Sequence, residues 1–220
     1  MNEAHARDEI CRVGKSLFDR GYVHGTAGNI SVRLATGYLI TPTDACLGFL
    51  DPARLALVDA HGHQVSGDRA SKTLRLHQRI YETAVRFDPD TSCVIHTHST
   101  HCVLLTLNAS GPELLPPITP YFVMKVGHVP VIPYQRPGAP EVGDAVTTAI
   151  ERYGEQGTPI RGVMLERLGP NVWHDTPGSA MAVLEELEET ARLFAGCAVA
   201  PAALDESRIE DLRRAFGARW

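Results

Sequence analysis

Hydrophobic residues recur at helical spacing in several segments of this chain. Apolar positions three and four residues apart indicate helices with one buried face. The long helix over 177–195 is expected to bury Ala180, Val183, Leu184, Leu187, Ala191 and Phe194, and to stop at Gly196. The other predicted helices cover residues 7–20 with Gly21 as C-cap, 71–86, 99–107, 140–153 with Gly154 at its end, and a short piece of 201–220.

Short apolar runs between these helices predict strands. They lie at residues 38–41, 55–59, 65–66, 92–97, 129–134, 160–166 and 170–173. Pro130 and Pro133 indicate that the strand at 129–134 is an edge strand or an irregular one, because proline cannot donate a ladder hydrogen bond. Helices and strands alternate irregularly, without repeats or a linker. The pattern predicts a single α/β domain over residues 1–220, with a mixed, mostly antiparallel sheet covered by helices.

Composition narrows the classes of function. The 220 residues are 44% hydrophobic and 21% charged, which is ordinary for a globular protein. A net charge of −5 gives no footprint for nucleic acid or an anionic membrane surface. The first residues are polar and charged, and no apolar run is long enough to span a bilayer. Five scattered cysteines without a CxxC pair favour a reducing compartment, so we expect a cytoplasmic protein.

The segment from Cys93 to His101 holds the clearest candidate chemistry. His96 and His98 are two residues apart at the end of a predicted strand, so both side chains project to one side. Two convergent imidazoles suit zinc, iron, nickel or manganese. The alternative is that they are two polar residues leaving a buried strand. Cys93 and Cys102 flank them in apolar surroundings, and are expected to be packing residues.

Two further segments could bind an anion. The glycine-rich turn Gly25-Thr-Ala-Gly-Asn-Ile-Ser31 lets backbone amides approach a charged group closely. Ser71 is expected to be the N-cap of the helix over 71–86, with Lys72 and Arg75 close by. An ordinary turn and an ordinary capped surface helix are the alternatives.

Together these motifs resemble the class II aldolase/adducin family of metal-dependent sugar-phosphate lyases. The resemblance runs nearly end to end. It is similar most of all to the branch of 3-oxo-tetronate 4-phosphate decarboxylases, through segments such as Thr119-Pro-Tyr-Phe-Val-Met124 and Val129-Pro-Val-Ile-Pro-Tyr134. The motifs that carry the family resemblance are the turn over 25–31, Thr41-Pro-Thr43, Ser71-Lys72 before His77, and Val94-Ile-His-Thr-His-Ser-Thr100.

The resemblance implies a three-layer α/β/α domain and a homotetramer with active sites between subunits. It also implies a small-molecule substrate and a divalent metal, most often zinc, with manganese, iron, nickel or cobalt as alternatives. His96 and His98 would be metal ligands, and Tyr121 would lie at the subunit boundary near the substrate. The residues implied around the substrate phosphate are Gly28, Asn29, Thr43, Asp44, Ser71 and Lys72.

Three positions depart from the family pattern. Thr73 stands where the family has an acid/base glutamate, and Leu168 stands where it has a third metal-binding histidine. Asp44 follows the phosphate-loop threonine where glycine is frequent; it would repel a phosphate unless it points away or caps a helix. Candidate replacement ligands are His128, His101 and Glu166, with His101 alternatively capping its turn or contacting substrate. His77 is expected to be a packed helix residue, and His61, His63 and His174 turn residues.

Two classes of function follow. The first is a metal-dependent carbon–carbon lyase of decarboxylase or aldolase type, acting on a small phosphorylated oxo sugar acid or on an altered substrate. The second is a repurposed or inactive member with a binding or scaffold role. The first class is favoured by the retained residues His96, His98, Asn29, Ser71 and Tyr121. The three departures, Asp44, Thr73 and Leu168, favour the second class or a changed chemistry.

Overall fold

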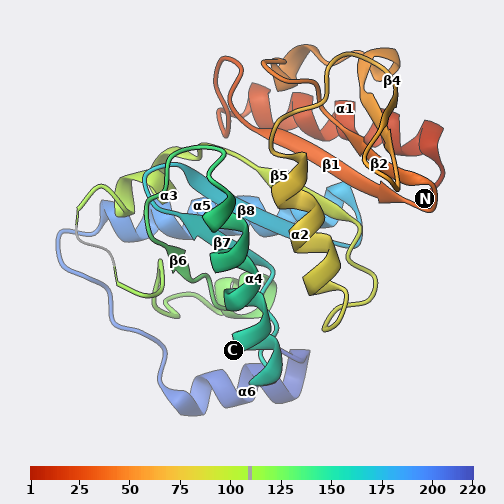
Figure 1. Ribbon diagram of the computed structural model, residues 1–220. Coiled ribbons are helices and arrows are strands. Elements are labelled where there is room, and N and C mark those ends of the chain that lie inside the picture. Colours follow the sequence, from red (N-terminus) through yellow and green to blue (C-terminus); the bar gives the residue numbers. More distant parts are fainter. Residues whose placement is uncertain (109–110) are drawn as a thin grey trace. The chain divides into compact units, whose positions relative to one another are not determined.

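The computed structural model of the protein, which describes residues 1–108 and 111–220, has an α/β fold (Figure 1). Its contacts divide the chain into two compact units. One holds residues 1–98 and 173–181, and the other holds residues 99–172 and 182–220. The prediction that residues 1–220 form a single domain stays a prediction. Within the described residues, no helix has the length and apolarity that crossing a membrane requires.

The first unit contains an antiparallel sheet in the order β4-β3-β2-β1-β5. Helix α1 packs on β1 and β2, and α2 packs on β1. The elements of this unit are α1 (Glu3–Asp19), β1 (Asn29–Leu34), β2 (Gly37–Ile40), η1 (Leu47–Phe49), η2 (Pro52–Arg54), β3 (Ala56–Asp59), β4 (Gln64–Ser66), α2 (Leu74–Ala84) and β5 (Cys93–His96).

The second unit contains β7 between an antiparallel β8 and a parallel β6. The mixed, mostly antiparallel sheet of the sequence prediction is therefore confirmed, with β6 at an edge. Strand β8 (Gly169–His174) and helix α5 (Pro177–Gly196) contribute residues to both units. The remaining elements are α3 (Thr100–Leu105), the π-helical turn η3 (Phe122–Val126), β6 (Val131–Ile132), α4 (Pro140–Glu155), β7 (Gly162–Leu165) and α6 (Glu206–Phe216).

Several expected boundaries differ from the observed ones. Helix α2 begins at Leu74 with Thr73 as N-cap, so Ser71 is not the N-cap and lies in a turn before the helix. That start is fixed by packing, because Leu74 is buried with Ile40, Ala56 and Val58. Gly154 lies inside α4, and Phe194 is half-buried because α5 runs out to the surface in its last turns.

A polar chain is buried between β1 and α2. Ser31 Oγ lies 2.7 Å from both His77 Nδ1 and the Tyr81 hydroxyl, and that hydroxyl donates to the carbonyl oxygen of Ser31 at 2.9 Å. All of these bonds form together if His77 Nδ1–H donates to Ser31 Oγ, which in turn donates to Tyr81. His77 Nε2 then carries a lone pair, which costs less to leave buried without a partner than an N–H group.

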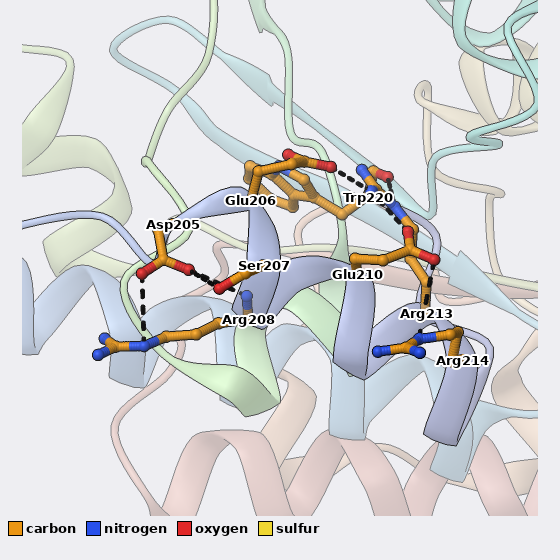
Figure 2. A network of polar contacts seen from close by, with 8 residues as sticks. All are labelled: Asp205, Glu206, Ser207, Arg208, Glu210, Arg213, Arg214 and Trp220. Carbon is orange, nitrogen blue, oxygen red and sulfur yellow. Dashed lines mark hydrogen bonds and ion pairs between the residues drawn. The ribbon is translucent and has the colours of Figure 1, made fainter.

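Helix α6 and the residues that flank it, from Asp205 to Trp220, form a network of hydrogen bonds and ion pairs (Figure 2). Asp205 caps the helix by accepting from the Arg208 amide at 3.0 Å, and Arg213 Nε donates to the Trp220 carbonyl oxygen at 2.8 Å. The Trp220 ring stacks on His128 with centroids 4.2 Å apart. These contacts join α6 to the segment around η3 within the second unit.

The buried imidazole of His77 predicts that the protein loses stability in mild acid. Burial first, and then the charge of His96, lower its pKa to about 3. The unfolded chain, with a pKa near ~6.5, therefore takes up the proton first as pH falls, and the stabilisation present above that pH is lost. Between pH 7 and pH 5 this group alone lowers the free energy of unfolding by about 2 kcal/mol.

Urea unfolding in the presence of a chelator would measure this loss. The His77→Asn variant should be less stable at pH 7 but lose about 2 kcal/mol less than the unmodified protein between the two pH values. His61→Asn, at an exposed turn residue, is the matched control and should keep the full loss. Equal pH dependence in all three proteins would contradict the assignment.

Candidate functional site

The two histidines of the HxH motif converge at the end of β5. The His96 and His98 ring centroids are 5.1 Å apart, with the ring planes at 67°. Two imidazoles bound to one tetrahedral zinc at about 2.0–2.1 Å would have centroids about 5 Å apart. His96 is buried and His98 half-buried; burial first, and then the charge of His24, lower the pKa of His98. A lowered pKa keeps this imidazole neutral, which is the form that binds a metal.

The glycine-rich turn brings Asn29 beside His96. These two residues are directly paired in the antiparallel ladder of β1 and β5, so their side chains share the face that Ser31 turns toward α2. Gly28 has a φ of +85°, and a Cβ there would lie 2.9 Å from the His96 carbonyl oxygen. Only glycine allows so close an approach without displacing the histidine strand.

Asn29 ends in a buried atom with no partner. The residue is 6% exposed, and its Oδ1 atom has no hydrogen-bond partner among the residues that the structure describes. An amide in this situation is costly unless a ligand or water completes its bonds. Asn29 is therefore the best-supported binding residue of the turn.

Hydrogen bonds from backbone amides join the Thr41–Thr43 loop to the start of β1 and to the turn that holds Ser71. The amide of Ile30 donates to Thr41 Oγ1 at 3.2 Å, and the amide of Ser71 donates to the Thr41 carbonyl oxygen at 3.2 Å. The Thr43 amide donates to the Arg69 carbonyl oxygen at 2.9 Å. The segments that were expected to bind an anion are thus joined to one another by hydrogen bonds within the first unit.

Thr73 takes part in a local hydroxyl pair. Its Oγ1 lies 2.9 Å from Ser71 Oγ, and its amide donates to the same oxygen at 3.4 Å. Neither hydroxyl can replace a carboxylate as a base near neutral pH. Ser71 and the exposed Lys72 also line a cavity of about 490 Å³, together with Tyr38, Arg75 and Glu82. His96, His98, Asn29 and Thr43 are not among its lining residues.

Asp44 adopts the left-handed conformation that explains why glycine is frequent at this position. Its φ is +57°, and aspartate is one of the few other residues that tolerate this region. The side chain is exposed. A capping role is not supported, since the next helix, η1, has Cys46 at its N-cap and no side-chain cap bond.

A third histidine, which sequence reasoning missed, lies near the pair. His24 is exposed in the loop between α1 and β1, and its ring centroid is 6.4 Å from that of His98, with the planes at 72°. The available signal was its position directly before Gly25, at the start of the turn that carries Asn29. His24, His96 and His98 all belong to the first unit.

The comparison with known proteins identifies the family. The model of the class II aldolase and adducin N-terminal domain matches residues 8–195. This chain belongs to the class II aldolase and adducin family. A relative from Cupriavidus necator named 3-oxo-tetronate 4-phosphate decarboxylase is 51% identical over 99% of both chains.

Further relatives support the same family and fold. A protein of the same name from Pectobacterium atrosepticum is 40% identical over 88% of this chain and 85% of its own. The crystal structure of YgbL from Klebsiella pneumoniae is 37% identical and superposes with a TM-score of 0.83, covering 97% of this chain and all of that one. The predicted class II aldolase-like fold is therefore confirmed.

The second unit of this class II aldolase family member engages the other candidate ligands in its own contacts. His101 Nδ1 lies 2.8 Å from Glu188 Oε1, and Glu188 also accepts from the His101 and Cys102 amides. The start of α3 is thus capped by Glu188, where His101 itself had been a candidate cap. Glu166 Oε2 accepts from the Tyr134 amide at 2.8 Å.

His128 is held on three sides. Its Nδ1 atom lies 3.1 Å from Glu113 Oε1, its ring stacks on Trp220, and the Tyr153 ring is 5.2 Å away. These are the contacts of a packed side chain. The role of His128 as a metal ligand stays a prediction. Burial first, and then Glu113, raise the pKa of Tyr153 to about 12.

The imidazoles of His96 and His98 suit a divalent cation, but they form only part of a metal site. His96 and His98 have the separation of two ligands, but no group of three His, Cys, Asp or Glu side chains within residues 1–108 and 111–220 is already converged on a metal position. Leu168 has no donor atom and lies in the turn between β7 and β8. Arg167 before it has a φ of +62°, so this turn contains a residue in the left-handed region.

The close approach of Gly28 to the histidine strand gives a testable consequence. Gly28→Ala combines a positive φ with a contact on the His96 carbonyl oxygen, and should lower the free energy of unfolding by about 2–3 kcal/mol. Gly25→Ala is the matched control, because its φ is +54° but nothing lies within 4 Å of the added carbon. Its cost should stay near ~1 kcal/mol, the strain of the backbone alone.

Denaturant unfolding of the unmodified protein, Gly25→Ala and Gly28→Ala would separate the cost of backbone strain from the cost of the steric contact. Equal losses for Gly25→Ala and Gly28→Ala would contradict a steric role of Gly28 against β5.

Proposed function

We propose that this chain is a metal-dependent carbon–carbon lyase that decarboxylates a small phosphorylated oxo sugar acid of the 3-oxo-tetronate 4-phosphate type. The observation that carries the proposal is the 51% identity, over 99% of both chains, with a relative of that name. The convergence of His96 and His98 beside the buried Asn29 supports a working site.

The metal is proposed to lie against His96 and His98. Zinc suits two imidazoles, and manganese, iron, nickel or cobalt would also accept them. When bound, a divalent cation supplies Lewis-acid stabilisation of negative charge on an oxygen next to the reacting carbon. His96 is held for this role by β5, and His98 lies in the short irregular segment between β5 and α3.

The phosphate end of the substrate is proposed to bind along the neighbouring turns. Asn29 offers a buried amide, Ser71 a hydroxyl and Lys72 a positive charge, and Gly28 gives the turn its positive φ of +85°. Thr43 belongs to the same run of linked segments. Asp44 is exposed, so its carboxylate can stay in water while the phosphate binds elsewhere on the loop.

Thr73 favours decarboxylation over aldol cleavage as the reaction. Aldol cleavage begins with removal of a hydroxyl proton, for which a positioned base is needed. A 3-oxo acid is already ionised at its carboxylate. Its carbon–carbon bond breaks with release of CO₂, and the electron pair moves onto the neighbouring carbonyl to form an enolate. The carbon then takes a proton, so a donor is required but a carboxylate base is not.

The assembly is proposed to be a homotetramer with active sites between subunits. Tyr121 is 59% exposed at the start of η3, which supports a contact with a partner subunit or with substrate for this side chain. An aromatic residue this exposed is typical of an interface.

A non-catalytic role is the second candidate. It is favoured by Leu168 and Thr73, which remove a donor atom and a carboxylate from positions where the family has them. The two functions differ in metal binding and in turnover, so both can be measured on the same preparation.

Restoring the family residues tests whether this chain works as it stands. Under the proposal, the unmodified protein releases CO₂ from 3-oxo-tetronate 4-phosphate. Thr73→Glu alone should change the rate constant by less than about 3-fold, because no base is required. An inactive unmodified protein that gains activity only in the double variant Leu168→His/Thr73→Glu would overturn the proposal.

Metal content per chain tests the cofactor. Elemental analysis of protein purified without chelator or affinity tag should give about one divalent metal per chain, which His96→Ala should lose because one of two converged donors is gone. His63→Ala, in an exposed turn, is the control and should keep the metal. Protein without metal in every case would leave the binding or scaffold role as the better account.

A further inference from the structure

Trp220 is held against the π-helical turn η3 by its ring and by its backbone. The indole ring stacks on His128 with the centroids 4.2 Å apart and the planes at 22°, and it meets the Phe122 ring edge-on at 5.7 Å and 60°. The Trp220 carbonyl oxygen accepts from Arg213 Nε at 2.8 Å (Figure 2). All of these residues belong to the second unit, so the arrangement depends on that unit alone.

The backbone just before Trp220 also packs closely on the end of this turn. Gly127 ends η3 with a φ of +77°, and a Cβ at this position would lie 3.0 Å from the Arg219 carbonyl oxygen. The Gly127 amide donates to the Phe122 carbonyl oxygen at 3.0 Å, which closes the turn. A π-helical turn is rare and occurs frequently at functional sites, so the contacts that stabilise it bear on function.

His128, on which the indole ring lies, is itself fixed. Its Nδ1 atom lies 3.1 Å from Glu113 Oε1, and the same carboxylate accepts from the Tyr153 hydroxyl and from the Val129 amide. The imidazole therefore cannot turn without breaking its bond to Glu113. Trp220 thus packs between a fixed ring and the first residue of η3.

Tyr121 directly precedes this first residue and projects away from the core. It is 59% exposed, whereas Phe122 is fully buried. The Phe122 amide donates to Thr119 Oγ1 at 3.1 Å, and Tyr121 already has helical torsions, with φ at −68° and ψ at −37°. Because successive side chains of a helical turn point in set directions, a fixed Phe122 also determines where the Tyr121 side chain leaves the backbone.

We propose that Trp220 is a positioning residue, which holds η3 so that Tyr121 keeps the orientation that its contact with substrate requires. The inference rests on the proposed function, in which Tyr121 lies near the substrate. A side chain that is already oriented before substrate arrives loses less conformational freedom on binding. Loss of the Trp220 ring should therefore weaken catalysis through Tyr121, although Trp220 itself touches neither substrate nor metal.

Hydrogen–deuterium exchange of the full-length protein tests whether Trp220 holds the turn. In Trp220→Ala the amides of residues 122–127 should exchange at least about 5-fold faster, because two aromatic contacts are lost. Trp220→Phe keeps a ring at this position and should restore most of the protection. Phe216→Ala is the matched control, since Phe216 is 65% exposed in the last turn of α6, and it should leave these amides unchanged. Equal exchange in Trp220→Ala and the unmodified protein would overturn the inference.

A double-mutant cycle on CO₂ release from 3-oxo-tetronate 4-phosphate tests whether Trp220 acts through Tyr121. Trp220→Ala and Tyr121→Ala should each lower kcat/KM by about 10-fold, and the double variant should be no slower than Tyr121→Ala alone. Losses that multiply in an active protein would show a general structural effect and overturn the positioning role, with the proposed function intact. An unmodified protein without activity would overturn the proposed function and the positioning role together, whatever the exchange rates are.

Discussion

The antiparallel pairing of β1 with β5 is the constraint on which the candidate site depends. It sets Asn29 opposite His96 and Ser31 opposite Val94, so one register determines which residues face α2. A shift by one residue between the two strands would place His96 and Asn29 on opposite faces of the sheet. Gly28 helps to hold this register, because its missing side chain admits the His96 carbonyl oxygen at the end of the ladder.

A second set of contacts in the first unit joins strand β1 to helix α2. The bonds from His77 through Ser31 and Tyr81 return to the backbone of β1, so a helix and a strand are joined by one closed polar chain. Such a network stabilises a unique arrangement when its polar atoms have hydrogen-bond partners. Among the described residues of this chain of bonds, the atom without a partner is His77 Nε2. The departures from the family pattern lie outside this chain: Thr73 is in the turn before α2, and Leu168 is in a hairpin turn of the second unit.

Much of the fold could be predicted from hydrophobic spacing, and the HxH pair from a period of two. The start of α2 could not, because the burial of Leu74 against β2 and β3 is a tertiary contact that outweighs the capping preference of Ser71. His24 was missed because its neighbours are 72 and 74 positions away in sequence, at His96 and His98. The candidates His101, His128 and Glu166 were chosen by closeness in sequence or family position, and their hydrogen bonds to Glu188, Glu113 and Tyr134 depend on packing.

The two histidines next to His98 are held differently, and this difference has a kinetic consequence. His96 is fixed in a ladder and buried, whereas His24 stands in solvent on a loop bounded by glycines with positive φ. A side chain on such a loop can change its position without disturbing the sheet. Motion next to His98 would then begin at the loop, and its rate would be set by the opening of a few backbone torsions rather than by unfolding of the core.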